Sequence, residues 1–183
     1  MATKVRQHEA LQSLLLEMPG QVDTLIERRS VTGFIDFCRR AEDALKGFGF
    51  RQAADVAAAR AMVEARPVSA ERGPRSRKDK ARRALEQSGT VQRALSDAIL
   101  PAEETIAQAR PLIRQIINLI AASGALRIGE AHEVADLPGR IWTLASGHEQ
   151  LSPLALQARI HLDRGDILAV ILAELDLADF MED

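Results

Sequence analysis

Apolar residues recur along the chain at intervals of three and four positions. The pattern is clearest in the apolar positions Ile106, Ala109, Ile113, Ile116, Ile117 and Ile120. An interval near 3.6 residues is the repeat of an α-helix, whereas a strand buried on one side alternates with a repeat of two. No segment shows a convincing alternation of the second kind. The sequence therefore predicts an all-α protein, either a multi-helix bundle or two packed helical subdomains joined by a basic linker.

Prolines and glycines divide this helical pattern into shorter segments. We expect Pro19-Gly20 to end a first helix, Ser88-Gly89 to separate two helices and Pro111 to kink or divide a longer one. Proline removes a backbone donor and glycine disfavours the helix, which is why these residues mark boundaries. The expected helices cover about 3–17, 22–29, 33–46, 51–65, 81–87, 91–100, 101–123, 130–137, 140–145, 152–162 and 167–180.

The composition changes between residues 67 and 80. This stretch is rich in helix breakers and charged residues, and Val68 is its one aliphatic residue larger than alanine. Such a composition is typical of a linker. The sequence predicts an N-terminal helical unit over 1–67, a basic, flexible linker over 68–80 and a C-terminal helical unit over 81–183 that ends in an acidic helix. The two units are also compatible with packing as one domain.

A cluster of basic residues overlaps the end of this linker. Bases in such a run can contact phosphates, so the cluster is the candidate polyanion-binding site. Two other interpretations are a contact with an acidic protein surface and a solvated tether. Its members are Arg72, Arg75, Arg77, Lys78, Lys80, Arg82 and Arg83, against the acids Glu71 and Asp79.

The residues after this cluster have the outline of a helix-turn-helix, with a turn at Ser88-Gly89-Thr90. The first turns of the second helix carry one base, Arg93, and one acid, Asp97. This charge balance gives little support to a recognition helix.

Charge and composition limit the classes of function. Lys plus Arg number 24 and Asp plus Glu number 26, which excludes a generally polycationic nucleic-acid coat. Aromatic residues make up 3% and tyrosine is absent, so we do not expect a binding site rich in aromatic side chains. The one cysteine excludes a disulfide within the chain, and no apolar run is long enough to span a membrane. The sequence therefore predicts a soluble cytoplasmic protein that contacts no membrane.

No constellation of reactive side chains stands out. The histidines His8, His132, His148 and His161 lack the spacing of three or four that brings two metal ligands onto one helix face. Cys38 lies among apolar residues of an expected helix, so we expect a buried thiol rather than a nucleophile. No Gly-Lys-Ser/Thr sequence is present to hold phosphates. These features predict a protein without enzymatic activity, cofactor or metal site.

Residues 112–122 are apolar over much of the helix circumference. A helix of this kind is either central to a core or covered by another chain. The same side chains therefore serve equally well as core or as interface. The candidate interface residues are Leu112, Ile113, Ile116, Ile117 and Ile120, followed by Leu175, Leu177 and Phe180 near the acidic C-terminus.

These features together favour a non-enzymatic protein–protein interaction protein. It would be an adaptor, a chaperone or a structural subunit of a larger assembly, associating with itself or with another protein. The alternative is a nucleic-acid-binding subunit or regulator that contacts phosphates through the basic residues at 72–83.

Overall fold

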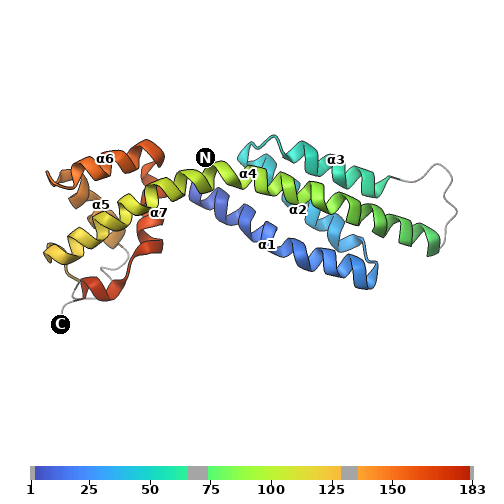
Figure 1. The fold of residues 1–183 in the computed structure, drawn as a ribbon, viewed down its shortest axis with the longest axis horizontal. Helices are drawn as coiled ribbons and strands as arrows, with labels where there is room; N and C mark the ends of the chain where they lie inside the picture. The colour runs from blue at the N-terminus through green and yellow to red at the C-terminus, as the bar shows by residue number, and fades with distance from the viewer. Residues whose placement is uncertain (1–2, 66–73, 129–135, 182–183) are drawn as a thin grey trace. The chain divides into compact units, whose positions relative to one another are not determined.

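The computed structural model describes residues 3–65, 74–128 and 136–181, and most of them are helical (Figure 1). Within these ranges no strand is present, which confirms the prediction of an all-α multi-helix protein. The helices are α1 (Lys4–Arg28), α2 (Thr32–Phe48), α3 (Ala53–Glu64), α4 (Pro74–Ser123), α5 (Leu137–Gly147), α6 (Ser152–His161), α7 (Arg164–Glu174) and the 3₁₀ helix η2 (Leu177–Phe180).

The chain forms two compact units, each with its own core. Unit 1 contains residues 6–101, and unit 2 contains residues 3–5 together with the chain from 102 onward. The division therefore falls at Pro101, inside α4, whereas the sequence predicted a linker over 68–80. Residues 74–80 are helical, and 66–73 lie outside the described residues.

Unit 1 is built from α1, α2, α3 and the first part of α4, and its core is a continuous set of apolar side chains. Phe34 and Phe37 stack within it, with ring centroids 6.5 Å apart. α2 ends at Gly49, whose φ of 80° is a left-handed conformation that glycine adopts without strain. Fully buried members of this core are Leu11, Phe37, Cys38, Leu45, Val56, Val63, Val91 and Leu95.

α1 continues through Pro19, where the sequence predicted its end. Proline removes one backbone hydrogen bond from the helix. Met18 and Leu25, on either side of this point, are both buried in the core of unit 1. Their burial outweighs the lost hydrogen bond and keeps the helix in register.

α4 is likewise continuous through Ser88-Gly89, where two helices were expected. Ala84, Val91 and Leu95 are buried at the spacing of one helix face across this point. The Ser88 hydroxyl donates to the carbonyl of Leu85 at 2.8 Å and so stays within the helix. The helix-turn-helix outline is therefore wrong, because burial of one continuous face overrides the weak helix propensity of serine and glycine.

Unit 2 packs the second part of α4 with α5, α6, α7 and η2. The structure places the candidate interface residues mostly in this core. Leu112 and Leu175 are half-buried, and Leu177 is exposed. The prediction that this set forms an exposed interface is corrected, because its apolar faces are covered by the other helices of the same unit. The buried members are Ile113, Ile116, Ile117, Ile120 and Phe180.

Residues 174–181, the described part of the acidic C-terminus, are held against the rest of unit 2. The N–H of Ile128 donates to the carbonyl of Phe180 at 2.9 Å, next to a β-bridge between Ile128 and Met181. Glu174 accepts hydrogen bonds from Arg110 at 2.9 Å and from Arg114. In the described part of the chain, no helix is long and apolar enough to cross a membrane.

Candidate functional site: a groove along α5

One face of α5 borders three hollows in the described part of unit 2. Their volumes are about 670, 600 and 400 Å³. The first hollow shares Thr143 and Arg164 with the second, and Ser146 and Arg159 with the third. The hollows adjoin one another at these shared residues, and we call the three together the α5 groove.

Small residues leave the room for this groove. Gly139 and Gly147 both line it, and a Cβ added to either would meet no atom within 4 Å apart from its own helix and chain neighbours. Thr143 and Ser146 donate their hydroxyls to the carbonyls of Gly139 and Trp142, each at 2.8 Å. The hydroxyl oxygens keep lone pairs that can accept from a ligand. The opposite face of α5 carries the buried side chains of Leu137, Ile141 and Ala145.

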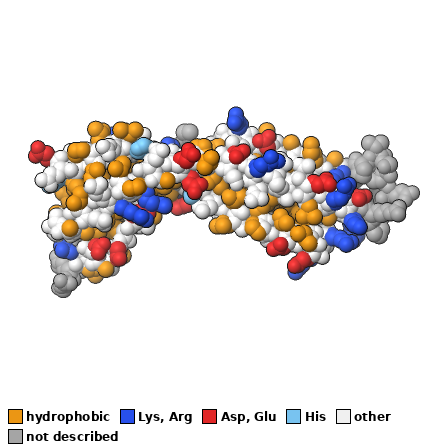
Figure 2. All heavy atoms as spheres, viewed as in Figure 1, with side chains coloured by type: hydrophobic (Ala, Val, Ile, Leu, Met, Phe, Trp, Pro, Cys, Tyr) orange, Lys and Arg blue, Asp and Glu red, His pale blue; other side chains and the backbone are white. Residues whose placement is uncertain are grey.

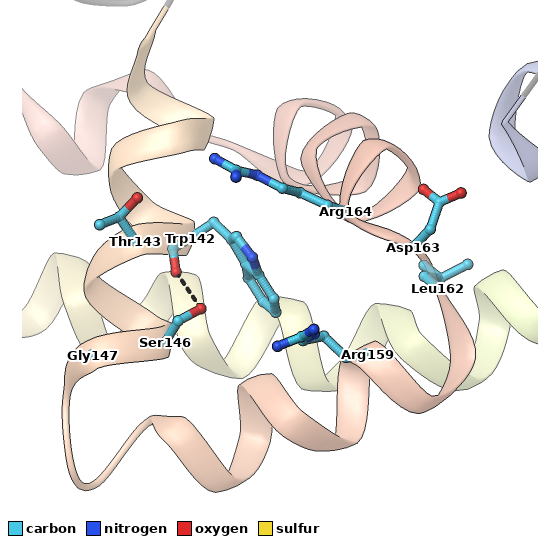
Figure 3. A pocket seen from close by; sticks show the side chains of 8 residues that line it. All are labelled: Trp142, Thr143, Ser146, Gly147, Arg159, Leu162, Asp163 and Arg164. Atoms are coloured by element: carbon cyan, nitrogen blue, oxygen red, sulfur yellow. Dashed lines mark hydrogen bonds between the residues drawn. The ribbon is translucent and has the colours of Figure 1, made fainter.

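Trp142 and Leu162 form the apolar part of the first hollow (Figure 3). Trp142 is 6% exposed and Leu162 is 2% exposed, so both are fixed in the core and present small surfaces to the hollow. Trp142 is the one tryptophan of the chain. Its fluorescence therefore reports directly on this hollow.

Two arginines supply the charge of the first hollow. Arg159 comes from the last turn of α6 and Arg164 from the start of α7. In Figure 3 the two side chains approach Trp142 from different sides. Both are exposed, and neither has an ion pair or hydrogen-bond partner for its guanidinium among the described residues. Two free guanidiniums at one hollow favour an anionic occupant.

Asp163 also lines this hollow, but its carboxylate has another task. Its Oδ1 accepts the N–H of Asp166 at 2.9 Å and caps the start of α7. Figure 3 shows the Asp163 side chain pointing away from Trp142. Asp163 keeps its charge at the rim of the hollow but forms no ion pair with Arg159 or Arg164.

Charged residues of unit 1 pair with one another instead. Glu42, 7% exposed, accepts from Lys46 and from Arg60, whose Nη2 lies 2.9 Å from Oε2. Arg60 also contacts Glu64 at 2.9 Å, and Glu64 contacts Arg39 at 3.0 Å. The hydrogen bonds from Lys46 and then Arg60 lower the pKa of Glu42. This network joins α2 to α3, and each of its charged groups has a partner within it.

The described members of the basic cluster predicted as a polyanion site all lie near the start of α4. Arg72 lies outside the described residues, as does the side chain of Arg75. Arg77, Lys78 and Arg82 are exposed, while Lys80 and Arg83 are half-buried, all on α4.

Helix geometry divides these bases among the faces of α4. Successive residues of a helix are about 100° apart, so Lys78 and Arg82, four positions apart, share one face, whereas Arg77 and Arg83 point in other directions. Arg82 contacts Glu86 at 3.3 Å. Figure 2 shows Lys and Arg side chains near this end of α4 standing among Asp and Glu side chains.

Reactive groups are few in the described residues. The Cys38 thiol is fully buried, and burial raises its pKa to about 12, so it is neither a nucleophile nor a metal ligand at neutral pH. No three His, Cys, Asp or Glu side chains gather as metal ligands in the parts of the chain described.

The sequence analysis missed Trp142, Arg159 and Arg164 as site residues. One signal was available: Gly139, Thr143 and Ser146 recur at intervals of three and four, which marks an open face of small residues on a helix. Nothing in the sequence indicated that two arginines from other helices border that face. Comparisons of the chain with protein-family models, with curated proteins and with solved structures find no match.

Proposed function

We propose that the chain is a non-enzymatic interaction protein that holds a segment of a partner protein in the α5 groove. The observation that carries this proposal is that three open hollows adjoin one another beside α5 and share lining residues. A small-molecule site is usually one enclosed cavity, whereas a run of connected open hollows suits a chain segment.

The length of the groove fits a short segment. α5 has 11 residues. With a rise of 1.5 Å per residue it extends over about 16 Å, the length of about five extended residues or about three helical turns. A segment of this size can be recognised by a few side-chain anchors.

The α6 side of the groove adds apolar surface. Leu156 lines the third hollow and is 63% exposed, and Ile160, one turn further along α6, is 74% exposed. Residues four apart lie on the same helix face. Figure 2 shows hydrophobic side chains gathered over α6. This surface supports a partner that carries apolar anchors of its own.

The nucleic-acid alternative remains a prediction with less support. Lys78 and Arg82 share one face of α4, but Arg82 is paired with Glu86, and Arg77 and Arg83 point in other directions. Labelled duplex DNA titrated at about 50 and 200 mM salt tests it, since binding through phosphates weakens steeply over that range. We also propose a cytoplasmic location, supported by the free, buried Cys38.

Selection of short random peptides by display against the full chain tests the proposed function. We expect enriched peptides to change the emission of Trp142. Thr143→Phe fills the junction of the first two hollows and should weaken binding at least about tenfold. Gln115→Phe, at an exposed position of α4 outside the groove, is the matched control. The proposal is overturned if no peptide is enriched, or if Thr143→Phe binds as tightly as the unaltered chain.

A further inference from the structure

We propose that the α5 groove is selective for acidic segments, and that a carboxylate of the partner binds between Arg159 and Arg164 in the first hollow. This inference rests on the proposed function and names the chemistry of the partner segment.

The charge of the first hollow carries the inference. Arg159 and Arg164 line it together, and no described residue pairs with either guanidinium. The other acid at the rim, Asp163, is engaged in capping α7. A guanidinium presents planar N–H donors that match the two oxygens of a carboxylate. An acidic side chain from a partner would pair with these two guanidiniums.

The residues that line the groove indicate which other side chains the bound acidic segment carries. Trp142 and Leu162 give the first hollow an apolar floor, and Leu156 lines the third hollow. Apolar and cationic surface therefore alternate over a short distance along α5. A segment in which acidic and aliphatic residues alternate matches both kinds of surface.

A single-stranded nucleic acid fits the hollow less well than an acidic peptide. Bases bind such proteins by stacking on exposed aromatic faces. Trp142 is 6% exposed, so it offers too little of its ring for a base to stack on. The arginines could still meet phosphates, which makes an oligonucleotide the necessary competitor in the test.

The test uses a fluorescein-labelled peptide in which glutamates alternate with leucine and alanine, and a matched peptide with glutamine at every glutamate. Anisotropy is measured on the full chain. We expect the acidic peptide to bind at least about tenfold more tightly, and salt to weaken it. Arg159→Gln and Arg164→Gln should each remove most of this preference and leave binding of the glutamine peptide unchanged. Arg159→Lys, which keeps the charge, should retain part of it.

The control variant is Arg51→Gln, which, like each of the two arginine variants, removes one positive charge, here from an exposed position of unit 1. It should bind both peptides as the unaltered chain does. Equal binding of the two peptides, with loss of both in Thr143→Phe, would overturn the acidic preference and leave the proposed groove standing. Absence of binding by the acidic peptide would overturn the acidic preference. The display selection then tests separately whether the groove binds peptides. Displacement of the acidic peptide by a single-stranded oligonucleotide that also depends on both arginines would assign the hollow to phosphates instead.

Discussion

The backbone N–H of Val5 donates a hydrogen bond to Oδ1 of Asp166 at 2.8 Å, although 161 positions separate the two residues. Val5 lies in the first turn of α1, where backbone N–H groups have no partner within the helix. The fully buried carboxylate of Asp166 in α7 therefore caps this N–H in place of a side chain from the same helix end. The pair anchors the start of α1 in unit 2, to which residues 3–5 belong.

Removing this acceptor is expected to destabilise unit 2. Asp166→Ala leaves the Val5 N–H unpaired and should lower the free energy of unfolding by about 1–3 kcal/mol. Asp166→Asn keeps an oxygen acceptor and should lower it less. Urea denaturation followed through Trp142 emission measures both effects in unit 2. An equal or larger loss for Asp166→Asn would contradict the capping role.

The stability of unit 1 should depend on pH through Glu42. Its pKa is lowered from 4.5 in the folded chain by hydrogen bonds from Lys46 and Arg60, so the unfolded chain binds this proton more tightly. The resulting stabilisation is fully present above pH 4.5 and is lost as the pH falls through the folded-state pKa.

Glu42→Gln tests that account. It should lower the free energy of unfolding at neutral pH by about 1–3 kcal/mol and flatten its decline below the ordinary glutamate pKa. Circular dichroism during urea denaturation at several pH values measures this. Glu86→Gln, whose partner Arg82 is exposed, should change stability by less than about 0.5 kcal/mol. An unaltered pH dependence in Glu42→Gln would show that the ion pairs of Glu42 do not cause the decline in stability at low pH.

The Cys38 thiol should be inert in the folded chain. It is fully buried and its pKa is raised to about 12, so both access and thiolate formation are suppressed at pH 8. We expect Ellman's reagent to react slowly with the native protein and rapidly in urea. Because Cys38 is the one cysteine, the signal has a single source. Rapid stoichiometric reaction without denaturant would contradict the placement of this thiol.

Substitution of Ile116 tests whether this part of α4 belongs to the core of unit 2 or to an interface with another chain. Ile116 is 1% exposed, so Ile116→Asp places an unpaired charge in the core and should cost at least about 3 kcal/mol. We expect loss of the folded Trp142 signal rather than a change in oligomeric mass. Asn118→Asp, exposed on the same helix, is the control and should change stability by less than about 0.5 kcal/mol. A folded Ile116→Asp variant of altered mass by light scattering would restore the interface interpretation.

The helical class of the fold could be predicted from the sequence because the spacing of its apolar residues reports directly on buried faces. Ile113, Ile116 and Ile120 illustrate this, since all three are buried as one stripe of α4. Helix boundaries could not be predicted equally well. Pro19 and Gly89 are intrinsically unfavourable in a helix, but burial on both sides of each holds α1 and α4 continuous.

Sequence patterns could indicate the small residues of α5 but not the rest of the candidate site. Arg159 and Arg164 meet Trp142 because α5, α6 and α7 pack together, and no local spacing encodes that meeting. The bases at 72–83 were predicted as a polyanion-binding site because they are contiguous in sequence. On a helix only positions three or four apart share a face, so a contiguous run places some of its bases on other faces.

Hydrogen exchange of the full chain, with and without a display-selected peptide, tests the α5 groove most directly. The account predicts slower amide exchange in 137–147 and 159–164 on binding, with no change in unit 1. Thr143→Phe should abolish that protection, and Gln115→Phe should leave it intact. Protection confined to residues 77–83, or bound peptide with unaltered exchange along α5, would contradict the assignment of the groove as the binding surface.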